Sequence, residues 1–262
     1  MALIQCNFFS EVLSVSTSIT VILPQETSNQ IGMNNKRNHE KIPTLYLLHG
    51  FSDDHTIWTR RTSIERYAAE YGLAVVMPQV DHSFYADMVY GKKYWTFISE
   101  ELPRVVRSFF PLSDRREDNF VAGLSMGGYG AFKWALRKPG MFSAAASLSG
   151  VLDIVEHTNR VQGENNPIRH ALDCVFGEKD IKNTEEDLFY LLEKRLKEDQ
   201  ALPALFQACG TEDFLFDENK RFFDFTNAKG VGITHTFTTG NHEWDYWDSK
   251  IQEVLAWLPI QK

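Results

Sequence analysis

The feature that most constrains this chain is a serine enclosed by glycines, in the segment Gly123-Leu124-Ser125-Met126-Gly127. The apolar run NFVA comes before it, and the following GGYGAFKWALRK has the composition of a helix. Such a strand-to-helix elbow exposes a serine hydroxyl, because its glycines tolerate a strained backbone and a close approach of neighbouring chain. The first turn of the helix also leaves backbone N–H groups free to stabilise negative charge. The pattern predicts Ser125 as a nucleophile, in preference to a structural serine in a glycine turn.

The elbow belongs to a longer alternation of short apolar runs and helix-length segments that begins at Ile42. The expected strands are TLYLLHG, LAVVMPQ, NFVAGLS, AAASLSG and ALFQACG, and the β-rich run ITHTFTTG closes the series. Near-continuous apolar strands are typical of a parallel sheet covered on both faces. Helices are expected over Thr62–Tyr71, Tyr94–Phe109, Gly127–Arg137, Asp217–Ala228 and Asp245–Leu258. This order predicts an α/β fold: a three-layer α/β/α sandwich around a mostly parallel sheet of about eight strands, with right-handed crossovers.

Three other segments complete the expected organisation. Ala2–Phe9 and Val12–Leu23 are β-branched without helical periodicity, so we expect antiparallel strands at one edge of the sheet. The Asn-rich stretch 25–41 is expected to be a surface loop. The charged stretch at about 151–203, with a helix over Glu185–Glu198, reads as a small insertion between two strands. We therefore expect one domain over all 262 residues.

Composition narrows the function classes. A net charge of -8 gives no general attraction to nucleic acid or anionic lipid, so neither is an expected partner. The three cysteines show no CxxC pair and no spacing typical of zinc sites, so no metal site is expected. The N-terminus has no basic segment before an apolar stretch, and no window approaches the length of a membrane span. These observations predict a cytoplasmic protein.

A second motif, His49-Gly50-Phe51, ends the first strand of the alternation. In a fold with a nucleophile elbow, the loop after this strand supplies one oxyanion N–H group, and the residue after the nucleophile supplies the other. The backbones of Phe51 and Met126 are therefore the predicted oxyanion hole. The alternative is a plain turn at the end of a strand, with a hydrogen-bonded histidine.

The expected order of the remaining catalytic groups is an acid and then a histidine. Four histidines follow Ser125, and two of them, His157 and His170, fall in the charged insertion. His235 lies within the last strand pattern, whereas His242 follows that strand and precedes the final helix. This loop faces the edge of the sheet where catalytic groups gather, so His242 is the predicted general base.

The acid is expected just beyond the strand ALFQACG. Asp213 lies at the carboxyl end of that strand, which favours it as the group that orients the histidine. Glu212 and Asp217 are close competitors, and Asp153 is a more distant one. Asp217 also suits the N-cap of the helix that follows.

The loops around the predicted site are rich in aromatic residues, and these could line a substrate pocket or pack in the core. They are Phe51, Trp58, Phe84, Tyr85, Tyr90, Trp95, Trp244 and Trp247. Of these, Trp58, Trp95 and Trp244 are the predicted substrate-binding side chains. An aromatic cleft would favour small apolar acyl groups.

Four segments together resemble the esterase D group of α/β-hydrolases, and within it the bacterial tributyrin esterase type. They are HGFSDDHTIW, GLSMGGYGAF, CGTEDFL and GNHEWDYW, and the resemblance extends from Ile42 to Trp257. It implies an α/β-hydrolase fold without a large lid, activity on short-chain acyl esters, and the triad Ser125, Asp213 and His242. The group also includes S-formylglutathione hydrolases, feruloyl and acetyl-xylan esterases, and mycolyl transferases. The oxyanion loop of the formylglutathione enzymes resembles HGLTC, from which HGFSD departs.

The predicted function is therefore carboxylic ester hydrolysis through an acyl-enzyme on Ser125, without a metal or organic cofactor. Two other classes stay open: an acyltransferase that uses the same acyl-enzyme, and a non-catalytic binding protein on this fold. A binding protein would be expected to lack a triad member, and this sequence lacks none. The expected partner is a small-molecule ester. A homo-oligomer also stays open, since relatives in the group commonly pair.

Overall fold

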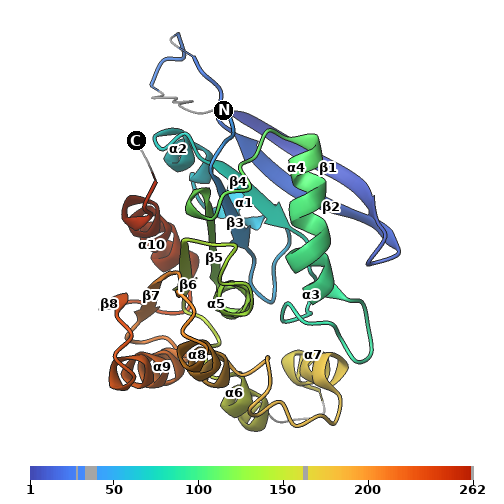
Figure 1. The fold of residues 1–262 in the computed structure, drawn as a ribbon, viewed down its shortest axis with the longest axis vertical. Helices are drawn as coiled ribbons and strands as arrows, with labels where there is room; N and C mark the ends of the chain where they lie inside the picture. The colour runs from blue at the N-terminus through green and yellow to red at the C-terminus, as the bar shows by residue number, and fades with distance from the viewer. Residues whose placement is uncertain (28, 33–39, 162–164, 261–262) are drawn as a thin grey trace.

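A twisted sheet forms the centre of the protein in this computed structural model, which describes residues 1–27, 29–32, 40–161 and 165–260 (Figure 1). Within these residues the sheet has eight strands, in the order β1-β2-β4-β3-β5-β6-β7-β8. Their bounds are β1 Ala2–Ser10, β2 Val15–Leu23, β3 Thr44–Leu48, β4 Ala74–Pro78, β5 Asn119–Leu124, β6 Ala144–Leu148, β7 Ala204–Gly210 and β8 Ile233–Thr238.

The strand directions confirm the predicted sheet. The first two strands pair antiparallel with each other, and β2 pairs antiparallel with β4, so the early segments do form one edge. From β4 to β8 every pairing is parallel. All residues of β3, β4, β5 and β6 are buried, as expected for strands with helices on both faces.

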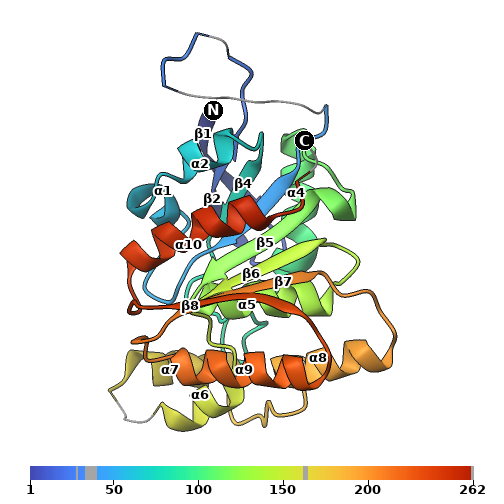
Figure 2. The ribbon, with the colours of Figure 1, turned by 90° about the vertical axis from the view of Figure 1, so that its left-hand side faces the viewer.

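Helices cover both faces of the sheet. On one face, α1 (Ile57–Arg61), α2 (Ile64–Ala69) and α10 (Trp244–Trp257) share an apolar core, and Figure 2 shows α10 lying across the strands. The other face has the larger core. Its helices are α3 (Tyr94–Thr96), α4 (Leu102–Phe109), α5 (Met126–Arg137), α6 (Ile154–Arg160), α7 (Pro167–Phe176), α8 (Leu188–Lys197) and α9 (Phe216–Ala228). These layers confirm the three-layer sandwich. A short 3-10 turn, Arg116–Asp118, precedes β5.

Two helices differ from their predicted bounds for identifiable reasons. The helix expected over Tyr94–Phe109 is interrupted by a π-helical turn at Phe97–Glu101. Pro103 follows in the first turn of α4, and because proline cannot donate the regular helical hydrogen bond, a wider turn precedes it. The helix expected over Glu185–Glu198 begins at Leu188 as α8, because the Asp187 side chain accepts the amides of Phe189 and Tyr190 and caps it.

The charged stretch 151–203 contains α6, α7 and α8, and connects β6 to β7. Residues 162–164 of this stretch lie outside the described residues, as do residues 28 and 33–39 of the predicted loop 25–41. The organisation as one domain with a small insertion stays a prediction. No helix in the described part of the chain is both long and apolar enough to cross a bilayer.

The parallel strands β3, β5, β7 and β8 end at the same edge of the sheet. The loops that follow them carry Phe51, Ser125, Asp213 and His242, in that order. Groups at the carboxyl ends of adjacent parallel strands converge, which is why open α/β sheets place their sites there. The fold therefore brings together four segments that are far apart in the sequence.

Candidate active site

Ser125 occupies a sharp elbow between β5 and α5. Its φ of 53° and ψ of -118° are strained for a residue with a side chain, at a cost of about 1–3 kcal/mol. The amide of Ser125 donates to the Leu148 carbonyl at 2.9 Å, which holds the elbow against β6. A Cβ at Gly127 would lie 2.6 Å from the backbone oxygens of Leu48 and His49. Only glycine therefore lets the start of α5 approach β3 this closely.

His242 connects Ser125 to Asp213. Its Nε2 lies 3.0 Å from Ser125 Oγ, and its Nδ1 lies 2.9 Å from Asp213 Oδ2 and 3.1 Å from Oδ1. The Asp213 side chain is 0% exposed, and Oδ1 also accepts the Leu215 amide at 2.8 Å. Because an ionised carboxylate only accepts, Nδ1 carries the proton and the Nε2 lone pair faces the serine hydroxyl. The structure thus brings the three predicted triad residues into one hydrogen-bonded line.

The loop that carries His242 is fastened to the loop that carries Asp213. The Glu212 side chain accepts the Gly240 amide at 2.7 Å, and this bond lowers the pKa of the Glu212 carboxyl. Gly240 has a φ of 152°, and a Cβ on the adjacent Gly210 would overlap its carbonyl. The ring centroids of Phe214 and Trp247 lie 4.5 and 4.8 Å from the imidazole centroid of His242. Two aromatic rings thus pack against the imidazole.

The competing acids have other partners or positions. Asp153 caps α6 by accepting the Glu156 amide at 3.1 Å, and it pairs with Arg221 at 3.0 Å. Glu212 accepts the amide of Gly240. Asp217 is the second residue of α9 rather than its N-cap, which is Leu215, so the N-cap alternative for Asp217 is wrong. The helix starts earlier because the Phe216 amide donates to the Asp213 carbonyl in the preceding turn.

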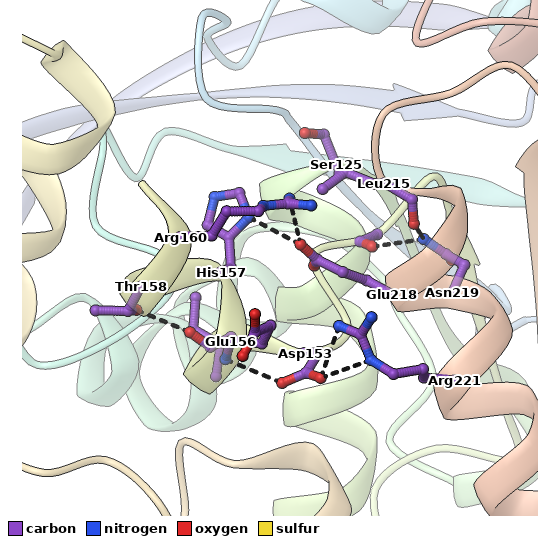
Figure 3. A network of polar contacts seen from close by, with 12 residues as sticks. Ser125, Asp153, Glu156, His157, Thr158, Arg160, Leu215, Glu218, Asn219 and Arg221 are labelled. Atoms are coloured by element: carbon purple, nitrogen blue, oxygen red, sulfur yellow. Dashed lines mark hydrogen bonds and ion pairs between the residues drawn. The ribbon is translucent and has the colours of Figure 1, made fainter. Parts of the chain in front are cut away.

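The other histidines make contacts away from this line. His157 is buried, and its Nδ1 lies 3.2 Å from Glu218 Oε1, which also accepts Arg160 at 2.5 Å. Figure 3 shows His157 and Arg160 pointing from α6 toward Glu218 of α9. His170 lies 3.9 Å from the Cys174 sulfur, and the ring of His235 packs against Phe223.

The predicted oxyanion loop lies next to the nucleophile. An ideal Cβ on Gly50 would lie 3.7 Å from the Ser125 Cβ, so the loop passes directly beside the elbow. Met126 is the first residue of α5, where the amide has no partner within the helix. His49 Nδ1 donates to the Gly50 carbonyl at 2.8 Å, and its Nε2 accepts the Val80 amide at 3.2 Å. The oxyanion loop and the start of α5 thus both adjoin Ser125, and the role of the Phe51 and Met126 amides as an oxyanion hole stays a prediction.

The three predicted substrate-binding tryptophans lie in different surroundings. Trp58 is almost fully buried, and its indole N–H donates to the Leu48 carbonyl at 3.1 Å. Trp244 is partly exposed and packs edge-on against Trp58 and against Trp247, the residue that contacts His242. Trp95 is buried on the other face of the sheet, with the Arg137 guanidinium 3.9 Å from its ring centroid. Of the three, Trp244 is linked to the His242 imidazole through one intervening ring, that of Trp247. Substrate contact stays a prediction for all three.

Sequence reasoning missed two polar groups beside the oxyanion loop. Asp53 is half-buried, and its Oδ2 lies 3.0 Å from the ideal Cβ position of Gly50. Burial raises the pKa of the Asp53 carboxyl, while a hydrogen bond with the Gly50 backbone and the nearby charge of Arg61 oppose that shift. The second group is the hydroxyl of Tyr85, which donates to the His49 carbonyl at 2.9 Å. The acidic HGFSDD segment was a signal for Asp53, whereas nothing local marked the hydrogen bond of Tyr85.

Within the described residues, no group of three or more histidine, cysteine, aspartate or glutamate side chains is arranged to hold a metal ion. The chemistry available to the site is that of an activated hydroxyl, with an imidazole beside the serine and a buried carboxylate behind the imidazole. On this fold, such an arrangement places the protein among the serine hydrolases.

Comparison with known proteins narrows that class. The family described as "Putative esterase" matches residues 10–258, and the chain belongs to this family. An acetyl esterase from Caldicellulosiruptor saccharolyticus is 32% identical over 98% of both chains. The substrate-bound structure of the fluorophosphonate-binding serine hydrolase FphF from Staphylococcus aureus superposes with a TM-score of 0.88 at 38% identity, over 100% of this chain and 99% of that one. The S-formylglutathione hydrolase FrmB from Staphylococcus aureus gives a TM-score of 0.84 at 38% identity, over 98% of both chains. The predicted class, a serine ester hydrolase, is confirmed.

Proposed function

We propose that this protein hydrolyses short-chain acyl esters of small alcohols through an acyl-enzyme on Ser125. The observation that carries the proposal is the unbroken line of hydrogen bonds from Asp213 through His242 to Ser125. His242 acts as the general base, and Asp213 holds its tautomer and stabilises the imidazolium that forms. The amides of Phe51 and Met126 receive the oxyanion.

The reaction proceeds in two halves. Ser125 Oγ bonds to the ester carbonyl carbon as its proton passes to His242 Nε2, and the carbonyl oxygen becomes an oxyanion. The carbon–oxygen bond to the alcohol then breaks, and the alcohol leaves with the proton from Nε2. Water adds to the acyl-enzyme, gives its proton to the same nitrogen, and releases the acid as Ser125 Oγ regains the proton.

The surroundings of the site and the name of one relative favour a small acyl group. The stretch 151–203 is short and strongly charged, so it does not supply the broad apolar cover of a long-chain lipase. One relative is named an acetyl esterase, which fits a small acyl group. We place the protein in the esterase D group, close to the tributyrin esterases, on the four segments that resemble that group.

Thioester hydrolysis is a second candidate, favoured by the 38% identity to a structure named an S-formylglutathione hydrolase. A thioester forms the same acyl-enzyme with loss of a thiol instead of an alcohol. The departure of HGFSD from HGLTC weighs against formylglutathione as the preferred substrate.

We propose that the protein acts in the cytoplasm. Cys6, Cys174 and Cys209 are free thiols, which fits a reducing cytoplasm. The net charge of -8 fits a protein that acts on small molecules without nucleic acid or membrane partners. A homo-oligomer is proposed only because relatives in the esterase D group commonly pair.

The test is turnover of p-nitrophenyl acetate, butyrate, octanoate and palmitate by the wild type and by Ser125→Ala. We expect acetate and butyrate to be the best substrates, and the variant to lose about 10⁶ in kcat. Ser108→Ala, on the exposed surface of α4, is the matched control and should leave the rate unchanged. Retained turnover by Ser125→Ala would overturn the nucleophile, and faster cleavage of palmitate than butyrate would overturn the acyl class. Parallel rates with S-formylglutathione, and with added methanol, distinguish the thioester and acyl-transfer alternatives.

A further inference from the structure

Two consecutive buried aromatic residues between β4 and α3 have strained backbones. Phe84 has a φ of 46° and Tyr85 a φ of 53°, and they are 2% and 0% exposed. Residues with side chains rarely adopt this conformation, which costs about 1–3 kcal/mol at each position. A strained backbone persists only where surrounding contacts enforce it. The contacts of Tyr85 therefore indicate which arrangement requires the strained backbone.

The strained backbone directs the Tyr85 side chain toward the residues that follow β3. Its hydroxyl donates to the His49 carbonyl at 2.9 Å, across 36 positions of sequence. The ring passes over Gly130 of α5, where a Cβ would overlap it. The Tyr85 amide donates to Ser83 Oγ at 3.1 Å, which secures the turn from inside. The hydroxyl is thus held in place by α5 and by its own turn.

This hydroxyl holds the first of two consecutive peptide groups in the oxyanion loop. Tyr85 binds the carbonyl of His49, and the His49 ring binds the carbonyl of Gly50 at 2.8 Å. In a trans peptide the C=O and N–H groups point in opposite directions. Fixing the Gly50 carbonyl toward the His49 ring therefore fixes the direction of the Phe51 N–H group, and fixing the His49 carbonyl fixes the backbone that carries the ring.

The ring of His49 suits this task because its protonation is constant. Its Nε2 accepts the Val80 amide at 3.2 Å, so the proton of the neutral ring lies on Nδ1, which donates to Gly50. Burial also lowers the pKa of His49 to about 4, so the ring stays neutral near pH 7. The loop is therefore held by two hydrogen bonds whose donors, the Tyr85 hydroxyl and the neutral His49 ring, keep their protons near pH 7.

We propose that Tyr85 is a positioning residue for the oxyanion hole, which acts by orienting the peptide groups of His49 and Gly50. The inference rests on the proposed oxyanion role of the Phe51 amide. An oxyanion donor stabilises the transition state more than the bound ester, so loss of its alignment lowers kcat and leaves KM nearly unchanged.

The test compares Tyr85→Phe with Tyr129→Phe. Both variants remove one buried hydroxyl, but that of Tyr129 donates to the Glu186 carbonyl at 2.9 Å, away from the oxyanion loop. Removing a whole oxyanion donor costs about 10²–10³ in kcat. Misaligning a donor that remains should cost less, so we expect Tyr85→Phe to lose about tenfold in kcat with KM within about twofold.

A trifluoromethyl ketone adds the readout that a purely structural role would not move. Its adduct with the serine carries an oxyanion in place of the ester transition state, so its inhibition constant reports the alignment of the donors. We expect it to weaken about tenfold in Tyr85→Phe, in parallel with kcat, and to stay unchanged in Tyr129→Phe. Gly130→Ala, which pushes on the Tyr85 ring without removing the hydroxyl, should change both quantities in the same direction.

Three results would overturn the inference: kcat of Tyr85→Phe within twofold of the wild type, a loss that appears only in KM, or an equal loss in Tyr129→Phe. If Tyr85→Phe does not fold, Gly130→Ala decides, and unchanged kcat and inhibition in that variant would refute the proposal. Failure of the esterase proposal would be visible separately, as retained turnover by Ser125→Ala.

Discussion

Replacing Asp213 by asparagine tests its role as the acid, because the contacts of its two carboxylate oxygens predict how the new amide group would lie. Asp213 Oδ1 accepts the Leu215 amide at 2.8 Å, while Oδ2 lies 2.9 Å from His242 Nδ1. An asparagine must keep its oxygen toward Leu215, because its NH₂ group cannot accept that amide. The NH₂ group then faces Nδ1 and donates to it. This moves the ring proton to Nε2, where it faces Ser125 Oγ and prevents proton abstraction.

The expected loss follows from that wrong tautomer. In the serine protease template, the same substitution lowers kcat about 10⁴-fold, which corresponds to about 5.4 kcal/mol of transition-state free energy. The assay is kcat for p-nitrophenyl butyrate, with unfolding followed in parallel. Glu212→Gln keeps an oxygen for the Gly240 amide and should retain most of the rate, as should Asp153→Asn and Asp217→Asn. If Asp213→Asn lost less than about tenfold while one of the others lost about a thousandfold, Asp213 would not be the acid.

Three further predictions concern stability. Gly123→Ala places a Cβ against the Gly127 carbonyl and should cost at least about 2 kcal/mol of unfolding free energy in urea, whereas Gly140→Ala, with open space around it, should cost little; equal effects would contradict the elbow packing. Burial lowers the pKa of His49 to about 4. Because the unfolded ring binds its proton near pH ~6.5, stability is full above that pH and should fall by about 3 kcal/mol as pH drops to 4. His49→Gln should flatten that slope, and an unchanged slope would refute the assignment. Arg160→Met removes the arginine partner of the buried Glu218, which keeps only His157, and should lower the free energy of unfolding by about 1–3 kcal/mol; adding Glu218→Gln should recover part of the loss, as measured by a double-mutant cycle.

The sheet and the elbow that carries Ser125 could be predicted because their signals are local. The apolar runs that became β3 to β6 are buried along their whole length, and that burial is written in each run by itself. The elbow of Ser125 is likewise a property of five neighbouring residues. The π-helical turn at Phe97–Glu101 was missed because helical periodicity continues through it, and only Pro103 marked the interruption.

Sequence position limits the candidates for the catalytic acid to a few carboxylates. The contacts that distinguish these carboxylates are not visible in the sequence. Glu212, Asp213 and Asp217 lie within six residues of one another, and sequence alone does not say which carboxylate a turn directs inward. The three-dimensional partners make the distinction: Glu212 holds the Gly240 amide, while Asp213 faces His242. Aromatic residues posed the same difficulty, since Trp95 and Trp244 look alike in sequence and lie on opposite faces of the sheet.

The hydrogen bond of Tyr85 shows why local sequence patterns do not predict the remaining contacts around the site. Its acceptor is 36 positions away, and the ring reaches it only because Gly130, on a third segment, leaves room. None of these residues predicts the contact alone, since a tyrosine in a loop, a glycine in a helix and a histidine after a strand each have ordinary explanations. The contact exists because the elbow at Ser125 sets the start of α5 against β3, and this brings Gly130 under the ring. The glycine-lined elbow is the feature that the sequence reveals most clearly. It thus also positions the Tyr85 hydrogen bond, which the sequence does not reveal.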